Sequence, residues 1–423
     1  MYMVILVLFY FLFPALLIYA TSKSTFLYKV GAVVLAYGIG LLLGNIGIFP
    51  AVSDMYHQLV QGQTALPADQ VQELFSKGTI TYHDVVRNQI ASVQDMITTI
   101  TIPLAIPLLL FSLDIRKWFR LAGTTFLSLI LALISVVVVV FAGYFIFRSK
   151  IPELGKIAGM LIGIYSGGTP NLAAIKTALN VDPDIFIMTH TTDIVIGAVC
   201  LLFLLTVAQR FFRIFLPPFK FNNTDIPVEQ LEQEAKEMDD YSGIFSRRIF
   251  PRLLLAFGLS ILIFATGGAL GLLAGEKSMM AVVILTITTL GLGLALIPAI
   301  NRIEKTYQTG MYLIIVFCLV VSSMADLRRM LNIEYLDLMM YVALVYFGSL
   351  LIHIFLSMIF RIDSDTVIIT STALIYSPPF VPVVAGALRN REVIISGLTT
   401  GIIGYVIGNY LGIFTGFFLT RLG

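Results

Sequence analysis

One aspartate in an apolar stretch is the residue of this chain best suited to chemistry. Asp193 lies in MTHTTDIVIGAV, where an ionised carboxylate at the centre of a membrane helix costs about 2.5–3.5 kcal/mol. His190 precedes it by three positions and so shares its helix face, with Thr191 and Thr192 between them. A carboxylate beside an imidazole can exchange a proton or hold Na⁺. The alternative is a packing pair near the membrane interface, since Asp184 marks the start of the same segment.

The stretch IYSGGTPN at 164–171 combines helix-breaking and polar residues inside another apolar segment. Glycine has little helical preference and proline has no N–H to donate, so we expect this helix to unwind near its middle. Unwound backbone in hydrocarbon must be buried in protein or line a wet cavity, where its free groups can bind a ligand. The alternative is close packing at the glycines and a simple kink at the proline. The residues assigned here to substrate binding are Ser166, Gly167, Gly168, Thr169 and Asn171.

We assign ion coupling to Asp193, His190, Thr192 and Asn171, with Na⁺ near Asp193 as the one possible cofactor. No other metal and no catalytic residue is expected. The sequence has no H-E-x-x-H, no G-x-S-x-G, no paired aspartates within a span and no nucleotide-binding G-x-x-x-x-G-K motif. The sequence therefore predicts neither an enzyme nor an ATP-driven pump.

Composition indicates which elements position these residues. The 423 residues are 58% hydrophobic and 12% charged, with a mean hydropathy of +0.93, which is typical of an integral membrane protein. A helix needs about 20 apolar residues to cross the bilayer. The net charge of +2 does not suggest nucleic acid as a partner. Twelve segments qualify as candidate spans: 2–20, 28–48, 96–113, 122–147, 157–180, 185–208, 251–274, 280–299, 309–325, 336–360, 366–388 and 393–419.

Short sequence matches recur in order about 210 residues apart. LDIRKW at 113–118 reappears as ADLRRM at 325–330, and IYSGG at 164–168 reappears as IYSPP at 375–379. IFR and TTD have similar echoes, so the chain is predicted to contain two homologous halves of six helices. The predicted division is a first membrane repeat at 1–208, a polar linker at 209–249 and a second repeat at 250–423.

Each predicted half contains one interrupted span, at 157–180 and at 366–388. Matching interruptions in two halves are a pointer to the substrate site of a transporter. Lys176 lies in the first of these spans. It either pairs with Asp193 or an anionic substrate, or extends its amine to the membrane interface, and the extension to the interface is slightly favoured. For His353 we expect a hydrogen bond within the bundle. The substrate-binding residues assigned in the second half are Ser377, Pro378, Pro379, Thr399 and Thr400.

The motifs GMLIGIYSGGTPNLAAIKTAL and GLTTGIIGYVIGNYLG carry a resemblance over nearly the whole chain. They resemble an uncharacterised family of bacterial polytopic membrane proteins, grouped with the superfamily of cation/proton antiporters and anion transporters that includes bile-acid and glutamate symporter relatives. The resemblance implies inverted repeats and a core domain of two crossing discontinuous helices that moves against a scaffold domain. It also implies an acidic residue on the helix after the first broken one, the place of Asp193. SPPFVP in the second half departs from the family's glycine pattern.

The sequence therefore predicts an all-α, multi-pass protein of the bacterial cytoplasmic (inner) membrane. The predicted function is secondary transport of a small organic anion or an amino-acid-like or peptide-like metabolite, coupled to H⁺ or Na⁺. Na⁺/H⁺ exchange without an organic solute and a channel are the alternatives. The expected partners are membrane lipid and the solute. A homodimer is compatible with the sequence, and both the topology and the oligomeric state stay open.

Overall fold

The structure is a computed structural model of the whole chain. It describes residues 2–24, 27, 31–60, 65–112, 123–220, 240–275, 279–324, 333–376, 380–388, 390 and 392–422.

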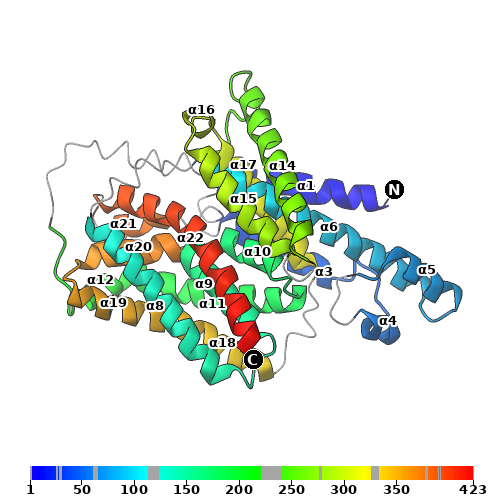
Figure 1. Cartoon of the computed structure of the whole chain (residues 1–423), viewed down its shortest axis with the longest axis horizontal. Helices are drawn as coiled ribbons and strands as arrows, with labels where there is room; N and C mark the ends of the chain where they lie inside the picture. Colours follow the sequence, from blue (N-terminus) through cyan, green and yellow to red (C-terminus); the bar gives the residue numbers. More distant parts are fainter. Residues whose placement is uncertain are drawn as a thin grey trace.

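Every regular element in the described part of the chain is a helix, which confirms the all-α prediction (Figure 1). The helices are α1 (Tyr2–Lys23), α3 (Ala32–Asn45), α4 (Asp54–Leu59), α5 (Ala68–Ser76), α6 (Tyr82–Phe111), α8 (Gly123–Phe147), α9 (Leu154–Gly167), α10 (Thr169–Ala178), α11 (Pro183–Thr206), α12 (Ala208–Phe212), α14 (Phe250–Leu273), α15 (Met279–Ala295), α16 (Pro298–Asn301), α17 (Thr306–Ser323), α18 (Ile333–Ala343), the π-helix η1 (Leu344–Gly348), α19 (Ser349–Ile359), α20 (Ser364–Tyr376), α21 (Val381–Leu388) and α22 (Val393–Leu422).

Eight helices in the described residues are long and apolar enough to cross a membrane, and three shorter ones are also apolar. Their outer faces carry exposed leucines that water would not favour, such as Leu12 at 64% and Leu262 at 63% exposure. Hydrocarbon solvates these side chains, because lipid tails are as apolar as leucine. The chain is therefore a multi-pass membrane protein, whereas the count of twelve spans stays a prediction.

The helices pack in two groups, and the pair α9 and α10 lies between them (Figure 1). In the first group α6 packs against α14, α15 and α17, while α3 and α1 pack on α17. In the second group α8 packs against α19, α20 and α9, and α11 packs on α18. Helix α9 lies along α22, and α10 contacts both α22 and the first group. The α9–α10 pair is thus enclosed where the two groups meet.

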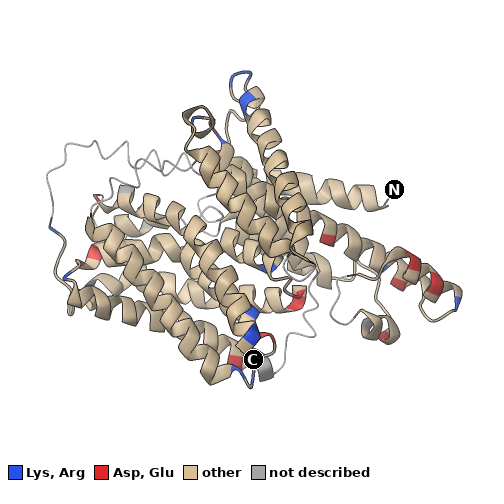
Figure 2. Ribbon diagram, viewed as in Figure 1, with Lys and Arg blue, Asp and Glu red and all other residues tan. Residues whose placement is uncertain are grey.

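The acidic stretch after α3 folds onto an extension of α6 rather than forming an open loop (Figure 2). Thr81 and Asp84 form a capping box that begins α6 before the apolar part of the helix. Asn88 accepts hydrogen bonds from the Tyr56 hydroxyl at 2.7 Å and from the Leu66 N–H at 2.7 Å. These bonds fix α4 and α5 beside the projecting end of α6.

Candidate functional site

The first broken segment is interrupted at Gly168. Helix α9 ends at Gly167 and α10 begins at Thr169, and Gly168 between them has φ 67° and ψ −155°. Only glycine adopts this conformation without strain. Pro170 then lies in the first turn of α10, where its missing N–H is one of those that a helix start leaves unpaired. The residue types at this break account for its position in the sequence.

A row of glycines on α22 lets that helix press directly onto the break. A Cβ added at Gly404 would lie 1.7 Å from the Ser166 carbonyl oxygen, and one at Gly408 would lie 2.0 Å from the Ser166 hydroxyl. Asn171 Nδ2 donates to the Gly404 carbonyl oxygen at 3.1 Å. A helix can approach its neighbour this closely only where it has no side chain at the point of contact. The backbone of α22 therefore covers the interrupted segment.

Several residues that we assign to the substrate are already partnered or enclosed. The buried Ser166 hydroxyl donates to the Ile162 carbonyl at 2.6 Å, and the Thr400 hydroxyl donates to the Ser396 carbonyl at 2.7 Å. Gly167 and Gly168 are buried, whereas Thr169 and Thr399 are partly exposed. Ser377, Pro378 and Pro379 lie outside the described residues. In this conformation the break presents few free groups.

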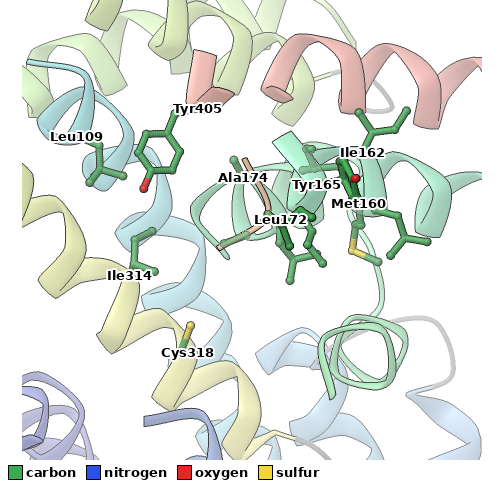
Figure 3. Close-up of a cluster of buried hydrophobic side chains, with 14 of the residues drawn as sticks. Leu109, Met160, Ile162, Tyr165, Leu172, Ala174, Ile314, Cys318 and Tyr405 are labelled. Atoms are coloured by element: carbon green, nitrogen blue, oxygen red, sulfur yellow. The ribbon is translucent and has the colours of Figure 1, made fainter. Parts of the chain in front are cut away.

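Figure 3 shows the interior beside the break. Tyr165 of α9 lies next to Met160 and Ile162, while Tyr405 of α22 faces Leu109 of α6 across the core. The Tyr165 side chain is 1% exposed, and its hydroxyl has no hydrogen-bond partner among the described residues. A buried phenol without a partner is costly and is often explained by a missing water or ligand.

Asp193 lies partly buried on α11, with its side chain 13% exposed. The Tyr346 hydroxyl, from η1, donates to Asp193 Oδ1. His190 Nε2 is 4.0 Å from Asp193 Oδ2, which is too long for a hydrogen bond. The Thr192 hydroxyl donates to the Met188 carbonyl at 2.8 Å. A tyrosine from a distant helix, rather than the neighbouring residues of α11, therefore binds this carboxylate.

Asn171, which we assign to the same ion site, shares no hydrogen bond with Asp193 among the described residues, since its amide bonds to α22. His190 is held by aromatic rings instead. Its ring centroid is 4.5 Å from that of Tyr37 and 5.6 Å from that of Phe186. Its Nδ1 is buried and has no partner in the described part of the chain.

Two further tyrosines lie beside the pair of Tyr346 and Asp193, and the sequence interpretation missed all three tyrosines. The rings of Tyr165 and Tyr346 are 6.2 Å apart in an edge-to-face arrangement. The Tyr376 hydroxyl donates to the Gly197 carbonyl at 2.7 Å, one turn along α11 from Asp193. The available signal was the repeated IYS, because Tyr165 and Tyr376 hold the same place in the two matches.

The π-helix places Tyr346 in this group. Residues 344–348 have π-helical geometry between α18 and α19, and single π-turns often occur at functional sites because the extra residue redirects a side chain. Gly197 allows the close approach, since a Cβ there would be 3.3 Å from the Tyr346 hydroxyl oxygen.

The other two polar residues considered within the spans have different outcomes. Lys176, for which an exit to the interface was favoured, is only 8% exposed because α6, α15 and α22 surround α10. His353 contacts Ser128 Oγ through Nε2 at 3.2 Å and Ser371 Oγ through Nδ1 at 3.1 Å. The predicted hydrogen bonding of His353 within the bundle is confirmed.

A second buried carboxylate, Asp365, is absent from the sequence prediction. It lies at the start of α20 and accepts hydrogen bonds from Asn390 Nδ2 at 3.0 Å and from Gln209 Nε2 at 3.2 Å. Arg213 NH2 is 3.7 Å from Asp365 Oδ1. Gln209 lies in α12, Arg213 is the residue after α12, and Asn390 follows α21. Asp365 therefore connects the start of α20 to both of these segments.

Comparisons with known proteins agree with a membrane protein. The model of the family described as "Protein of unknown function (DUF819)" matches residues 80–422. The chain is also 26% identical over 345 residues to the "Uncharacterized membrane protein YjcL" of Bacillus subtilis, an alignment that covers 77% of this chain and 83% of that protein. The chain therefore belongs to the DUF819 family. The match includes the break at Gly168, the predicted interrupted span at 366–388 and Asp193, whereas α1, α3, α4 and α5 precede it.

Proposed function

We propose that this member of the DUF819 family is a secondary active transporter of the bacterial cytoplasmic membrane. It moves a small organic anion, or an amino-acid-like or peptide-like metabolite, together with H⁺ or Na⁺ by alternating access. Asp193 is the coupling group, and the solute binds beside the broken segments. The finer superfamily placement, with inverted repeats and core and scaffold domains, belongs to the same proposal.

The observation that carries this proposal is that a residue beside the first break and a residue beside the second predicted break both reach the surroundings of one carboxylate. Tyr165 belongs to the last turn of α9, and Tyr376 is the last residue described before the second interrupted stretch. Tyr165 packs edge-to-face on Tyr346, which binds the Asp193 carboxylate, and the Tyr376 hydroxyl donates to the Gly197 carbonyl, one turn along α11 from Asp193. A solute that contacts either break would thereby change the surroundings of Asp193, which is what coupling between a solute and an ion requires.

The packing of the helices supports two related halves. If α6 corresponds to α17 and α3 to α15, as the order of elements suggests, then the contact of α17 with α3 corresponds to the contact of α6 with α15. Both contacts are extensive, and α6 and α17 pack against each other as a symmetric pair would. Such paired arrangements are common in transporters built from repeats.

An anionic solute suits the first break. The free N–H groups at the start of α10 carry partial positive charge, which attracts an anion. Because α22 covers the break, this conformation is closed there, and the proposed cycle requires α22 and α9 to separate. The glycine row makes the contact close without side chains that interlock.

The test uses the full chain in liposomes that contain a pH-sensitive dye. A panel of amino acids, dipeptides and dicarboxylates is first screened by thermal shift, since a ligand at 100 times its Kd stabilises the protein by about 2.7 kcal/mol. Any stabilising compound should then drive saturable proton or sodium movement. Asp193→Asn should reduce this movement at least ten-fold, whereas Asp337→Asn, which removes an ion pair with the exposed Lys150, should not.

Other outcomes would replace the proposal. If Na⁺ alone dissipates a pH gradient and no organic solute is needed, the protein is a Na⁺/H⁺ exchanger. A conductance that never saturates and survives Asp193→Asn would indicate a channel.

A further inference from the structure

Buried polar side chains recur along η1 and one face of α19. We call Tyr346, Ser349, His353 and Ser357 the polar file. Spacings of four residues place Ser349, His353 and Ser357 on one side of α19, and Tyr346 precedes them in η1. Ser349, His353 and Ser357 are 0% exposed, and Tyr346 is 2% exposed. From its first to its last member the file covers about 16 Å at 1.5 Å per residue.

Two hydroxyls of the file lack the bond that serines normally make inside membrane helices. Ser135 and Ser322 illustrate the usual state, because each donates to the carbonyl four residues earlier at 2.6 Å. The hydroxyls of Ser349 and Ser357 are buried and have no hydrogen-bond partner among the described residues. Unpartnered polar atoms at such depth indicate sites for water between the helices.

His353 lies in the middle of the file with both ring nitrogens in use. Nε2 contacts Ser128 of α8 and Nδ1 contacts Ser371 of α20, at 3.2 and 3.1 Å. A neutral imidazole accepts a hydrogen bond at one nitrogen and donates at the other, so it can take up a proton on one side and release one on the other. The two serines orient the ring for this exchange.

The two ends of the file reach different places. At one end Tyr346 donates directly to the Asp193 carboxylate. At the other end the Ser357 carbonyl accepts a hydrogen bond from the Ile362 N–H at 2.9 Å, in the turn between α19 and α20. Asp363 follows in this turn, and burial raises its pKa, with the neighbouring Asp365 adding to the effect. The turn that follows the outer end thus contains a carboxylate that binds protons more readily than usual.

We propose that the polar file conducts protons between Asp193 and the α19–α20 turn. In each transfer a hydroxyl, imidazole or intervening water accepts one proton from one side and releases one to the other, so the file returns to its starting composition. Water completes the steps, since side chains four positions apart are about 6 Å apart along the helix. The inference rests on the proposed function in one respect, because it identifies the proton as the coupling ion.

The experiment follows protonation of Asp193 without any solute. Full-length protein in detergent is subjected to a pH jump, and time-resolved infrared spectroscopy records the carboxyl band that Asp193→Asn removes. Ser349→Ala combined with Ser357→Ala should slow the appearance of this band at least ten-fold without changing its final size. Ser135→Ala, which removes a buried serine of α8 outside the file, is the matched control and should have the wild-type rate.

A second variant keeps the test decisive if the double variant does not fold. His353→Gln retains a donor and an acceptor for Ser128 and Ser371 but cannot take up a proton, so it should also slow the band at least ten-fold. Rates within two-fold of Ser135→Ala in the folded variants, or a wild-type protein whose Asp193 band never changes with pH, would overturn the proposal. Dissipation of a pH gradient by Na⁺ without an organic solute would refute the proposed solute transport but leave this measurement unaffected.

Discussion

The contact between α22 and the first broken segment leads to a graded stability prediction. At Gly404 the nearest atom that an added methyl group would meet is a backbone atom, the Ser166 carbonyl oxygen at 1.7 Å, followed by Leu374 Cδ2 at 2.8 Å and the Ser166 carbonyl carbon at 3.0 Å. At Gly408 the nearest atoms are the ends of side chains, Ser166 Oγ at 2.0 Å and Asn171 Nδ2 at 2.2 Å. Side-chain atoms can rotate away, whereas a helix backbone must move as a unit.

We expect Gly404→Ala to cost about 3 kcal/mol of the free energy of unfolding, at the upper end of typical overpacking penalties, or somewhat more. Gly408→Ala should cost about 1–2 kcal/mol, because the Ser166 and Asn171 side chains can rearrange. Gly258→Ala in α14 is the control, since an added methyl group there meets no atom within 4 Å. It should be neutral or stabilise by up to about 1 kcal/mol, because alanine favours a helix over glycine.

The assay is reversible unfolding in mixed micelles, titrated with sodium dodecyl sulfate and monitored by helical circular dichroism. The order of stability should be Gly258→Ala, then Gly408→Ala, then Gly404→Ala. Equal stability of the Gly404 and Gly258 variants would refute the close packing of α22 on the break. An inverted order of Gly404 and Gly408 would show that the backbone there yields more easily than the side chains.

Two further predictions concern charged groups outside the proposed site. Asp365→Asn should lower the free energy of unfolding by about 1.5–3 kcal/mol in the same assay, because a buried charged acceptor of the Asn390 bond is lost. Burial raises the pKa of Asp240, but hydrogen bonds from Lys305 and Ser242 lower the pKa by more than burial raises it. The pKa of Asp240 therefore lies below the ordinary value. The contribution of ionised Asp240 to the free energy of unfolding is present above about pH 4 and is lost as pH falls through the lowered pKa. The difference in the free energy of unfolding between wild type and Asp240→Asn, measured between pH 3 and 7, should follow this dependence.

Each of these predictions has a clear contrary result. For Asp365, the control is Glu73→Gln, since Glu73 pairs with Lys77 in the open and should contribute almost nothing; equal effects of the two substitutions would show that the Asp365 contacts do not stabilise the fold. For Asp240, a difference between wild type and variant that stays constant down to pH 3 would contradict the lowered pKa.

Sequence and structure agree most closely where a residue type has one physical use. A composition this apolar permits only a membrane protein, and an apolar chain with helical spans must pair its backbone internally. The interruption of segment 157–180 falls at a glycine because the conformation of Gly168 suits no other residue. The neighbouring proline adds to the same local effect, and both are visible without knowledge of any other part of the chain.

The partners of the polar residues could not be predicted in this way. Asp193 was paired by sequence proximity with His190, but its carboxylate is bound by Tyr346, 153 positions away. Asn171 was placed in the ion site, yet its amide bonds to α22. Asp365 was overlooked because its partners follow only from the way that α12 and the segment after α21 meet α20.

The sequence alone determined that lipid surrounds this protein, because apolar content sets the free energy of solvation. It also determined where the first broken helix is interrupted, because glycine and proline act through local backbone conformation. Only the tertiary structure decided that Tyr346 binds Asp193 with Tyr165 packed on Tyr346, and that α22 packs on Ser166 and Asn171 at the break. Those contacts depend on the relative rotation and height of packed helices, which many different sequences of apolar residues would allow. A helix can present any of its faces to a neighbour at similar hydrophobic energy in lipid, so small residues and a few buried hydrogen bonds select one arrangement.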